Sequence, residues 1–400
     1  MLLSGSCWIY PSTFRRYIPG SIRLGFTVLR AEIPDPPACQ FKPCKMIQKT
    51  LFKILLSPLS LLYGVGVGFR NLMYRTGVLK GISFDLPVIS VGNLSVGGAG
   101  KTPHIEYLVR LLKPYLNVAT LSRGYKRKTK GFLLARTDMT AEDVGDEPLQ
   151  FKRKFPHLTV AVAESRAFGI PEIMSRHPET QVILLDDAFQ HRSVAPGLNI
   201  MLTEYSHPFT RDYLLPSGRL REWRAAYQRA DMIIVSKCPP EVSAEAQNAL
   251  IEQINPYPHQ RIYFSYYDYG KPYFLFNSRY VLQWEPDVEV ILICALARTE
   301  YLTDYLDRQV DSVQVMEYED HHFFTNYDIA QLKANFDRLE SDKRVILTTE
   351  KDAMRLEMHR PYLTEQKMPI FVLPVEVQFH FGDGERFDQD IKDFLLNFKA

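Results

Sequence analysis

The residues that indicate chemistry most directly lie between positions 92 and 102, in the sequence GNLSVGGAGKT. The backbone N–H groups of such a glycine-rich loop can curl round phosphate oxygens, and a helix that begins at its end adds positive potential. Lys101 would reach the β- and γ-phosphates of a nucleotide, and Thr102 would ligate Mg²⁺. The expected nucleotide-binding residues are Ser95, Val96, Gly97, Gly98, Ala99, Gly100, Lys101 and Thr102.

The sequence on either side supports this interpretation. The apolar run VISV at 88–91 predicts a buried strand, and apolar residues at helical spacing predict a helix over 102–113. Strand, glycine-rich loop and helix together are the context that a P-loop requires. Ser95 departs from the usual G-x-x-x-x-G-K-[ST] pattern, which has Gly at this position. The alternative is a glycine-rich turn with a purely structural role.

A pair of carboxylates forms the second chemical feature. Val182–Leu185 is an apolar run that predicts a strand, and it leads into Asp186 and Asp187. A carboxylate at the C-terminal edge of a parallel strand beside a P-loop holds Mg²⁺ or its waters. A strand that ends in an ordinary polar turn is the alternative. Gln190 and His191 follow closely enough to face the same cleft.

The basic segment SRGYKRKTK at 122–130 carries five cations around Tyr125. Beside a P-loop, such a segment suits nucleotide phosphates or an anionic acceptor. Two alternatives stay open: a solvated loop, or a grip on a nucleic-acid backbone with a base stacked on the tyrosine. The net charge of +2 shows no overall excess that would favour nucleic acid.

These residues require a sheet to hold them together. Further apolar runs at 158–163, 199–203 and 232–236 are separated by helical stretches, so we expect a parallel α/β sheet. We expect a P-loop nucleotide-binding domain at 85–238, followed at 239–400 by a linker and a second α/β domain with a C-terminal helix. The site would lie in a cleft between them. Ser236 and Pro239 replace the Asn and Asp of a guanine-binding N-K-x-D element, which favours ATP.

The composition and the first 84 residues limit the class of protein. The chain of 400 residues is 46% hydrophobic, a globular balance, and its five cysteines are too few for a secreted disulfide framework. Residues 46–84 hold five basic and no acidic residues, with 16 uncharged residues at 54–69. We expect a membrane-associating helical segment there that lies on anionic lipid; a buried core helix is the alternative. We interpret residues 1–45 as a non-native or disordered extension, with Met46 as the start.

A set of segments, taken in order, resembles the tetraacyldisaccharide 4'-kinase family, the lipid A kinases of Gram-negative bacteria. The resemblance covers about residues 46–395. The chain departs from the family at Ala188, more often Gly, and at Ser217, Arg219 and Trp223, where Ala and Pro are more usual. The segments are ISVGNLSVGGAGKTP (89–103), LSRGYKRK (121–128), VGDEP (144–148), LLDDAFQHR (184–192), LLPSGRLRE (214–222), EDHHFF (319–324) and TTEKDAMR (348–355).

The resemblance implies an ATP-dependent kinase, with ATP and Mg²⁺ as cofactors. It would phosphorylate the 4'-hydroxyl of a tetraacylated glucosamine disaccharide 1-phosphate on the cytoplasmic face of the bacterial inner membrane. The resemblance makes Asp146 and His321 the catalytic pair that accepts the proton of the hydroxyl. Taken alone, these two would be a turn residue and a surface or core histidine. The remaining roles are Lys101 for catalysis, Thr102, Asp186, Asp187 and Glu147 for the metal, and Arg123, Gln190, His191 and Arg192 for the substrate.

Two other functions stay open. The first is a P-loop ATPase or kinase that acts on a soluble substrate, and the second is a nucleotide-dependent switch without transfer chemistry. The cationic apolar helix favours a lipid substrate, and the Asp146/His321 pair favours catalysis. We expect a membrane surface with anionic lipid as a partner, no nucleic acid, and no obligate protein partner.

Overall fold

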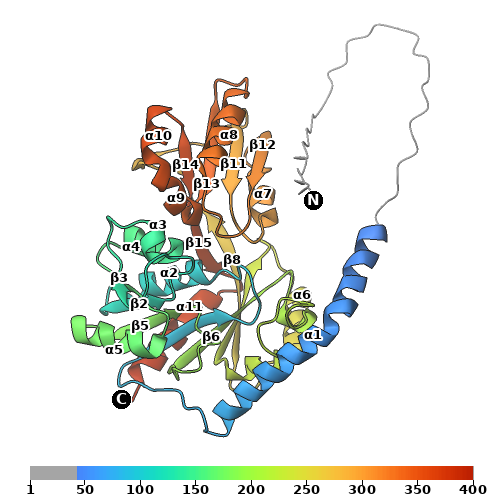
Figure 1. Ribbon diagram of the computed structural model, residues 1–400, viewed down its shortest axis with the longest axis vertical. Coiled ribbons are helices and arrows are strands. Elements are labelled where there is room, and N and C mark those ends of the chain that lie inside the picture. Colours follow the sequence, from blue (N-terminus) through green and yellow to red (C-terminus); the bar gives the residue numbers. More distant parts are fainter. Residues whose placement is uncertain (1–42, 400) are drawn as a thin grey trace, which may run out of the picture. The chain divides into compact units, whose positions relative to one another are not determined.

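The computed structural model describes residues 43–399, with side chains from residue 54 onward. Two sheets and the helices packed on them make an α/β fold, as predicted (Figure 1). Residues 47–400 form one compact unit. The expected N-terminal extension lies outside the described residues except for 43–45, which begin the first helix.

The first sheet has nine strands, in the order β15–β8–β7–β6–β1–β5–β2–β4–β3. Neighbouring strands from β8 to β4 are parallel, whereas β15 and β3 pair antiparallel at the two edges. Because β1 lies between β5 and β6, the glycine-rich loop leaves the middle of the sheet. The strands are β1 (Val88–Asn93), β2 (Val118–Ser122), β3 (Leu133–Leu134), β4 (Thr159–Val162), β5 (Val182–Asp186), β6 (Leu198–Glu204), β7 (Met232–Cys238), β8 (Arg261–Tyr269) and β15 (Val375–Phe379).

Helices cover both faces of this sheet. Val91 of β1 packs in the same core as Leu108 of α2, whereas Leu185 of β5 packs with Ile170 of α5 in a second core. Burial on both faces explains why these strands read as continuous apolar runs. The helices are α1 (Pro43–Arg75), α2 (Lys101–Leu112), α3 (Ala141–Val144), α4 (Asp146–Lys154), α5 (Arg166–Arg176), α6 (Ala244–Ile254), α7 (Glu300–Leu306), α8 (Asn326–Asp337), α9 (Glu350–Leu356), α10 (Arg360–Glu365) and α11 (Asp383–Leu396), with 3₁₀ turns η1 (Phe209–Arg211), η2 (Arg224–Arg229) and η3 (Glu357–His359).

The second sheet has six strands, in the order β10–β9–β14–β13–β11–β12. Its core of β14, β13, β11 and β12 is parallel, and β9 and β10 extend it antiparallel. The strands are β9 (Tyr273–Phe274), β10 (Asn277–Val281), β11 (Glu289–Cys294), β12 (Ser312–Glu317), β13 (Arg344–Thr349) and β14 (Ile370–Leu373).

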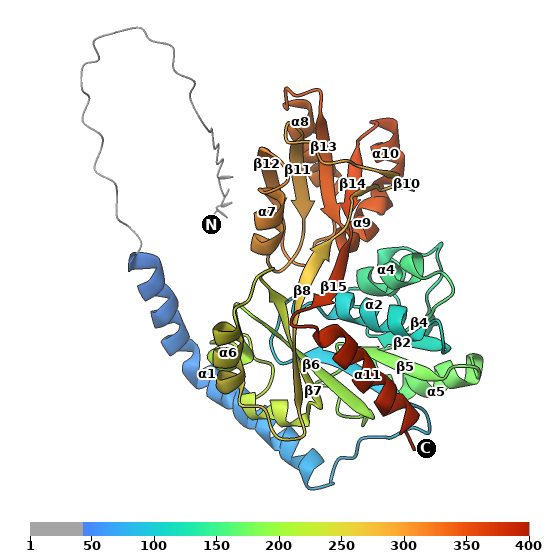
Figure 2. The same ribbon diagram turned by 180° about the vertical axis from the view of Figure 1, so that it is seen from behind.

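The sheets divide the chain differently from the boundary expected near residue 239. β8 pairs with β7, and β15 pairs with β8, so both strands belong to the first sheet. The helix α11 packs on β8 and β15 and therefore belongs with that sheet. The second sheet therefore takes residues 273–373, inserted between two strands of the first sheet (Figure 2). β8 is a strand that extends the first sheet beyond β7, although it lies in the range 239–400 expected to hold a linker and a second domain.

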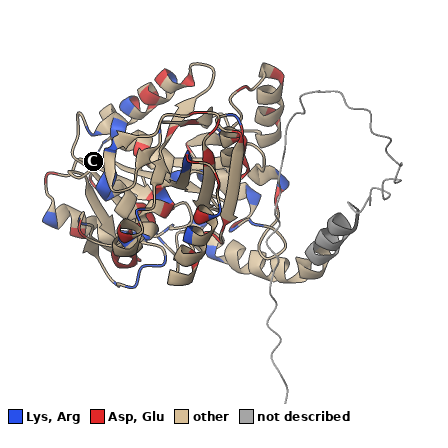
Figure 3. Cartoon of the chain, turned by 90° about the horizontal axis from the view of Figure 1, so that it is seen from above, with Lys and Arg blue, Asp and Glu red and all other residues tan. Residues whose placement is uncertain are grey.

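The helix α1 spans Pro43–Arg75 and continues through Pro58. Its described part is largely free of charged residues, whereas charges of both signs are spread over the rest of the described chain (Figure 3). The side of α1 at Ser60 and Gly64 is buried, and its large apolar side chains point outward. The exposed ones are Ile54, Leu55, Leu59, Leu61, Leu62, Val65, Phe69 and Leu72.

Candidate active site

The glycine-rich loop needs glycine at two positions for backbone reasons. Gly97 has φ 114° and Gly100 has φ 85°, values in the left-handed region that residues with a Cβ rarely adopt. A Cβ on Gly100 would also lie 2.3 Å from the hydroxyl of Tyr267. Gly100 is the N-cap of α2, so the loop ends at a helix N-terminus whose free N–H groups suit an anion.

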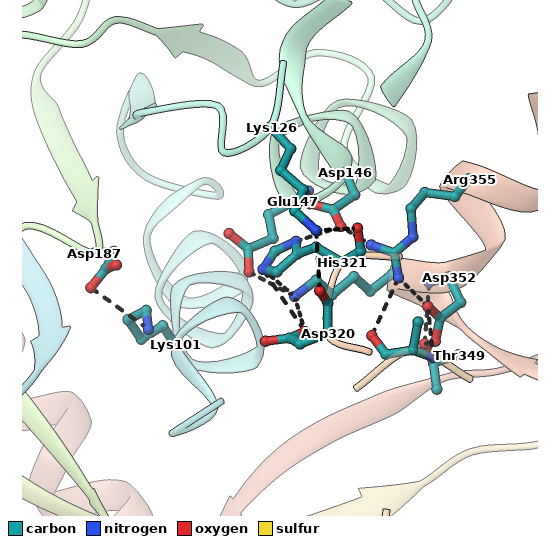
Figure 4. Close-up of polar contacts among 12 residues, drawn as sticks. Lys101, Lys126, Asp146, Glu147, Asp187, Asp320, His321, Thr349, Asp352 and Arg355 are labelled. Atoms are coloured by element: carbon teal, nitrogen blue, oxygen red, sulfur yellow. Dashed lines mark hydrogen bonds and ion pairs between the residues drawn. The ribbon is translucent and has the colours of Figure 1, made fainter. Parts of the chain in front are cut away.

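Lys101 is held between β1 and the end of β5. Its ammonium donates to Asn93 Oδ1 at 3.2 Å and lies 3.6 Å from Asp187 Oδ1 (Figure 4). The structure therefore brings Lys101 and Asp187 together. The guanidinium of Arg221 donates to both Asp187 oxygens, at 3.0 and 2.8 Å. Burial alone would raise the pKa of Asp187, but Lys101 and Arg221 outweigh it and hold that pKa below its usual range.

Asp186 lies in a different electrostatic environment. Its side chain is buried, and its Oδ1 has no hydrogen-bond partner among the described residues. Burial, and secondly the charge of Glu147, raise the pKa of Asp186 to about 8. A buried carboxylate that lacks a partner and faces a second carboxylate fits a site for a cation. Of the residues expected at the metal, Asp186 is therefore the one whose carboxylate oxygen lacks a hydrogen-bond partner among the described residues.

The described residues contain no cluster of three His, Cys, Asp or Glu side chains arranged to hold a metal. Mg²⁺ does not require one, because it is usually bound by one or two carboxylates together with waters and substrate phosphates. Thr102 is buried in the first turn of α2 and lines the same cavity as Glu147. Thr102, Glu147 and Asp186 are thus suited to Mg²⁺, whereas Asp187 is already paired with two cations.

Asp146 and His321 come from different parts of the fold and meet. Asp146 is the first residue of α4, and its Oδ2 lies 2.9 Å from His321 Nδ1 (Figure 4). The fully buried guanidinium of Arg355 on α9 also pairs with Asp146. Burial would raise the pKa of Asp146, but Lys351, His321 and Arg355 hold it below its usual range. An ionised Asp146 only accepts hydrogen bonds, so His321 donates to it from Nδ1.

Lys351 completes this group, and sequence reasoning missed it. Its ammonium lies 3.0 Å from His321 Nε2, and 3.4 Å from both Glu147 Oε1 and Asp320 Oδ1. Because an ammonium only donates, Nε2 of His321 accepts, which agrees with a neutral imidazole protonated at Nδ1. The negative groups around Lys351, Glu147 first, outweigh burial and raise its pKa above the usual range. Lys351 belongs to TTEKDAMR, a segment to which the sequence assigned no chemical role.

A cavity of about 840 Å³, its open mouth included, lies between the glycine-rich loop and the second sheet. Lys101 and Thr102 line it on one side and Lys351 on another, with Glu147 between them. Aromatic and aliphatic side chains also line this cavity, as in a pocket for an organic group. They are Tyr267, Tyr269, Leu296, Tyr301, Leu302, Leu373 and Val375.

The basic segment contacts the loop that carries His321. Lys126 donates to the backbone oxygen of His321 at 2.9 Å, and the rings of Tyr125 and His321 lie 4.7 Å apart. Arg127 pairs with Glu164, outside the cavity. The segment thus serves partly to position the loop of His321, a use that its composition did not reveal. The structure gives Arg123 an exposed position.

The other expected substrate residues occupy different environments. Gln190 donates to the backbone oxygen of Asn93 at 2.8 Å, and its own side-chain oxygen is buried without a partner among the described residues. Burial, followed by the charge of Arg166, lowers the pKa of His191 to about 4, so this ring is neutral. Arg192 donates to Asn71 Oδ1 of α1 at 3.1 Å and therefore helps to hold that helix.

Comparison with known proteins agrees with this geometry. A family model described as tetraacyldisaccharide-1-P 4'-kinase matches residues 52–396. The tetraacyldisaccharide 4'-kinase of Phocaeicola vulgatus is 44% identical over 346 residues, 85% of this chain and 94% of that protein. The same-named protein of Bacteroides thetaiotaomicron is 42% identical over 352 residues, 85% of this chain and 92% of that protein.

Among solved structures, the crystal structure of LpxK from Aquifex aeolicus in complex with ATP superimposes with a TM-score of 0.66. It is 28% identical, and the match covers 86% of this chain and 99% of the other. The family model covers more than half of this chain, and both relatives are more than 40% identical to it over the aligned residues. The chain therefore belongs to the tetraacyldisaccharide 4'-kinase family.

Proposed function

We propose that the protein transfers the γ-phosphoryl group of ATP to the 4'-hydroxyl of a tetraacylated glucosamine disaccharide 1-phosphate. The observation that carries this proposal is one cavity that is lined by phosphate-binding candidates and lies next to a candidate base. Lys101 and Thr102 line it from the end of the glycine-rich loop, and Glu147 and Lys351 line it as well. Lys351 contacts His321, which in turn contacts Asp146. Family membership supplies the acceptor, and the described ATP complex of a related kinase supports the donor.

The residues divide the work of phosphoryl transfer. Lys101 and the N-terminus of α2 would bind the phosphates and offset the charge on the migrating group. The sugar hydroxyl must lose its proton, and His321, oriented by Asp146, or Asp146 itself would accept it. In the conformation described, Lys351 occupies the lone pair of His321 Nε2, so Lys351 must shift before that nitrogen can take a proton.

Mg²⁺ is the proposed cofactor besides ATP. Thr102, Asp186 and Glu147 would hold it, with Asp187 at the same edge of the sheet. When bound, the ion would supply positive charge that offsets the negative charge of the phosphates. The unpartnered, buried oxygen of Asp186 supports this assignment, because a cation bound there would give that oxygen a partner.

The acceptor is acylated, and α1 offers an apolar surface for the membrane that contains it. Eight large apolar side chains of α1 are exposed, from Ile54 to Leu72. Arg70 and Arg75 lie in the last two turns of the helix, and Lys80 follows it. Within the described residues, no helix has both the length and the apolarity to cross a bilayer. We propose that α1 lies in the interface of anionic lipid, at the cytoplasmic face of the inner membrane.

The test is a transfer assay with purified protein, ATP, Mg²⁺ and the tetraacylated disaccharide 1-phosphate. We expect the acceptor to gain one phosphoryl group by mass spectrometry, and Lys101→Ala to gain none. The deacylated disaccharide 1-phosphate serves as the soluble comparison. Equal turnover of both acceptors would favour a kinase for soluble substrates, and ATP hydrolysis without a phosphorylated product would contradict the proposal.

A further inference from the structure

Residues 214–223, here called the connector segment, contact α1 on one side. Ser60 of α1 donates from Oγ to the backbone oxygen of Leu214 at 3.1 Å. The indole N–H of Trp223 donates to the backbone oxygen of Gly64 at 2.8 Å. The face of α1 that carries Ser60 and Gly64 is therefore occupied by the connector segment and is separate from the outward apolar face.

The same segment reaches the nucleotide site through one residue. Tyr63 of α1 donates from its hydroxyl to the backbone oxygen of Arg221 at 2.8 Å. Arg221 donates from its backbone N–H to Leu94 at 2.8 Å, and its guanidinium donates to Asn93 Oδ1 at 2.6 Å. The guanidinium also holds both oxygens of Asp187. One residue thus joins α1, the start of the glycine-rich loop and the end of β5.

Arg221 and Lys101 share the same two partners, Asn93 and Asp187. Asn93 Oδ1 and Asp187 Oδ1 lie 3.2 and 3.6 Å from the ammonium of Lys101. The loop backbone is tied to the same segment, because Val96 donates from its N–H to the backbone oxygen of Arg219 at 2.7 Å. A shift of the connector segment would therefore move the partners of Lys101.

We propose that Arg221 is a positioning residue for the nucleotide site, and that the seating of α1 on the connector segment sets its position. This inference rests on the phosphate-binding role proposed for Lys101. Two further residues of the connector segment, Ser217 and Trp223, contact α1 directly. Ser217 donates from its backbone N–H to Ser60 Oγ at 2.9 Å, so both residues face α1.

Two glycines of α1 allow the seating to be changed without altering the apolar face. A Cβ on Gly64 would lie 2.4 Å from Cζ2 of Trp223 and 2.8 Å from Cδ1 of Leu214, both closer than real Cβ contacts. A Cβ on Gly66 would meet nothing within 4 Å. Gly64→Ala and Gly66→Ala give the helix the same gain in helical propensity. They differ in the contact with the connector segment.

We expect Gly64→Ala to lower kcat/KM for ATP by about tenfold or more, because displacing a catalytic group by about 1 Å can cost up to about 100-fold. Gly66→Ala should stay within about twofold of wild type. Sedimentation with phosphatidylglycerol vesicles should be equal for both variants, because neither changes an exposed apolar side chain. A wild-type kcat/KM for Gly64→Ala, or an equal fall for Gly66→Ala, would overturn the inference.

Tyr63→Phe covers the case in which Gly64→Ala does not fold. It removes one hydroxyl, the donor to Arg221, and leaves the ring in place. We expect KM for ATP to rise at least about threefold, with an unchanged melting temperature; an unchanged KM would contradict the inference. Lys101→Ala separates the two proposals, because an active Lys101→Ala enzyme would refute the phosphate-binding role itself.

Discussion

The pair Asp146 and His321 allows a double-mutant cycle. Asp146→Asn keeps the size of the side chain and removes its charge, and His321→Ala removes the imidazole. General-base assistance is typically worth about 10²–10⁴-fold in rate, or about 3–5 kcal/mol at 1.36 kcal/mol per factor of ten. The Nδ1–Oδ2 distance of 2.9 Å predicts that the two side chains act as one unit.

We therefore expect each single variant to lower kcat by about 10²-fold or more, with little change in KM for ATP. The double variant should resemble the worse single variant, because residues that act as a unit are not additive. The coupling energy would then be about 3 kcal/mol or more. The measurement is kcat and KM for wild type, both single variants and the double variant, at saturating acceptor.

His322→Ala is the matched control. His322 is adjacent in sequence, but its Nε2 lies 2.9 Å from Asp328 and its ring stacks 4.8 Å from that of Tyr318. Its loss should cost stability more than kcat. Asp146→Asn leaves Arg355 with Asp352 as its remaining carboxylate, so melting temperatures must accompany the kinetics. Full additivity would refute the single unit, and a loss confined to KM would move both residues to substrate binding.

Three further outcomes follow from the site and from α1. Lys351→Met should lower kcat by about tenfold or more, because it removes the charge that contacts His321, Glu147 and Asp320, and Lys351→Arg should lower it by less. Equal steady-state rates for the two variants would contradict a role for this charge. Asp186→Asn should raise the Mg²⁺ concentration for half-maximal rate, in a Mg²⁺ titration where an unchanged midpoint would remove Asp186 from the metal site. Replacing Leu61 and Leu62 by Asp should reduce vesicle binding and lipid turnover together, because about 1.5–3 kcal/mol per buried leucine is lost; unchanged vesicle sedimentation would exclude this face.

The parts of the site that are local in sequence could be predicted. The glycine-rich loop and the pair at 186–187 each follow an apolar strand, and adjacent parallel strands bring such ends together: Val91 is paired in register with Asp186. Arg221 and Lys351 could not be found in this way. Each is one cation among many in the sequence, and its role appears only through partners that are distant along the chain, Asp187 for Arg221 and His321 for Lys351.

The two sheets show the same limit. That β1, β5 and β6 lie in one parallel sheet follows from their apolar runs, as the sequence predicts. The return of β15 to β8 does not, because this pairing joins residues more than 100 positions apart and leaves no local signal. Likewise, α1 reads as amphipathic from its apolar residues, but the contact of Gly64 with Trp223 requires the folded chain.

In the proposed reaction, Lys101 and the Asp146–His321 pair act on one phosphoryl transfer to a lipid-borne sugar hydroxyl. The most direct measurement follows the label from ATP labelled in its γ-phosphoryl group, with the tetraacylated disaccharide 1-phosphate in phosphatidylglycerol vesicles. We expect label on the 4'-oxygen of the sugar with wild-type protein. We expect no labelled lipid with Lys101→Ala and at least about 100-fold slower labelling with His321→Ala. Label that appears only as free phosphate, or labelled lipid formed at the wild-type rate by His321→Ala, would contradict the proposed reaction.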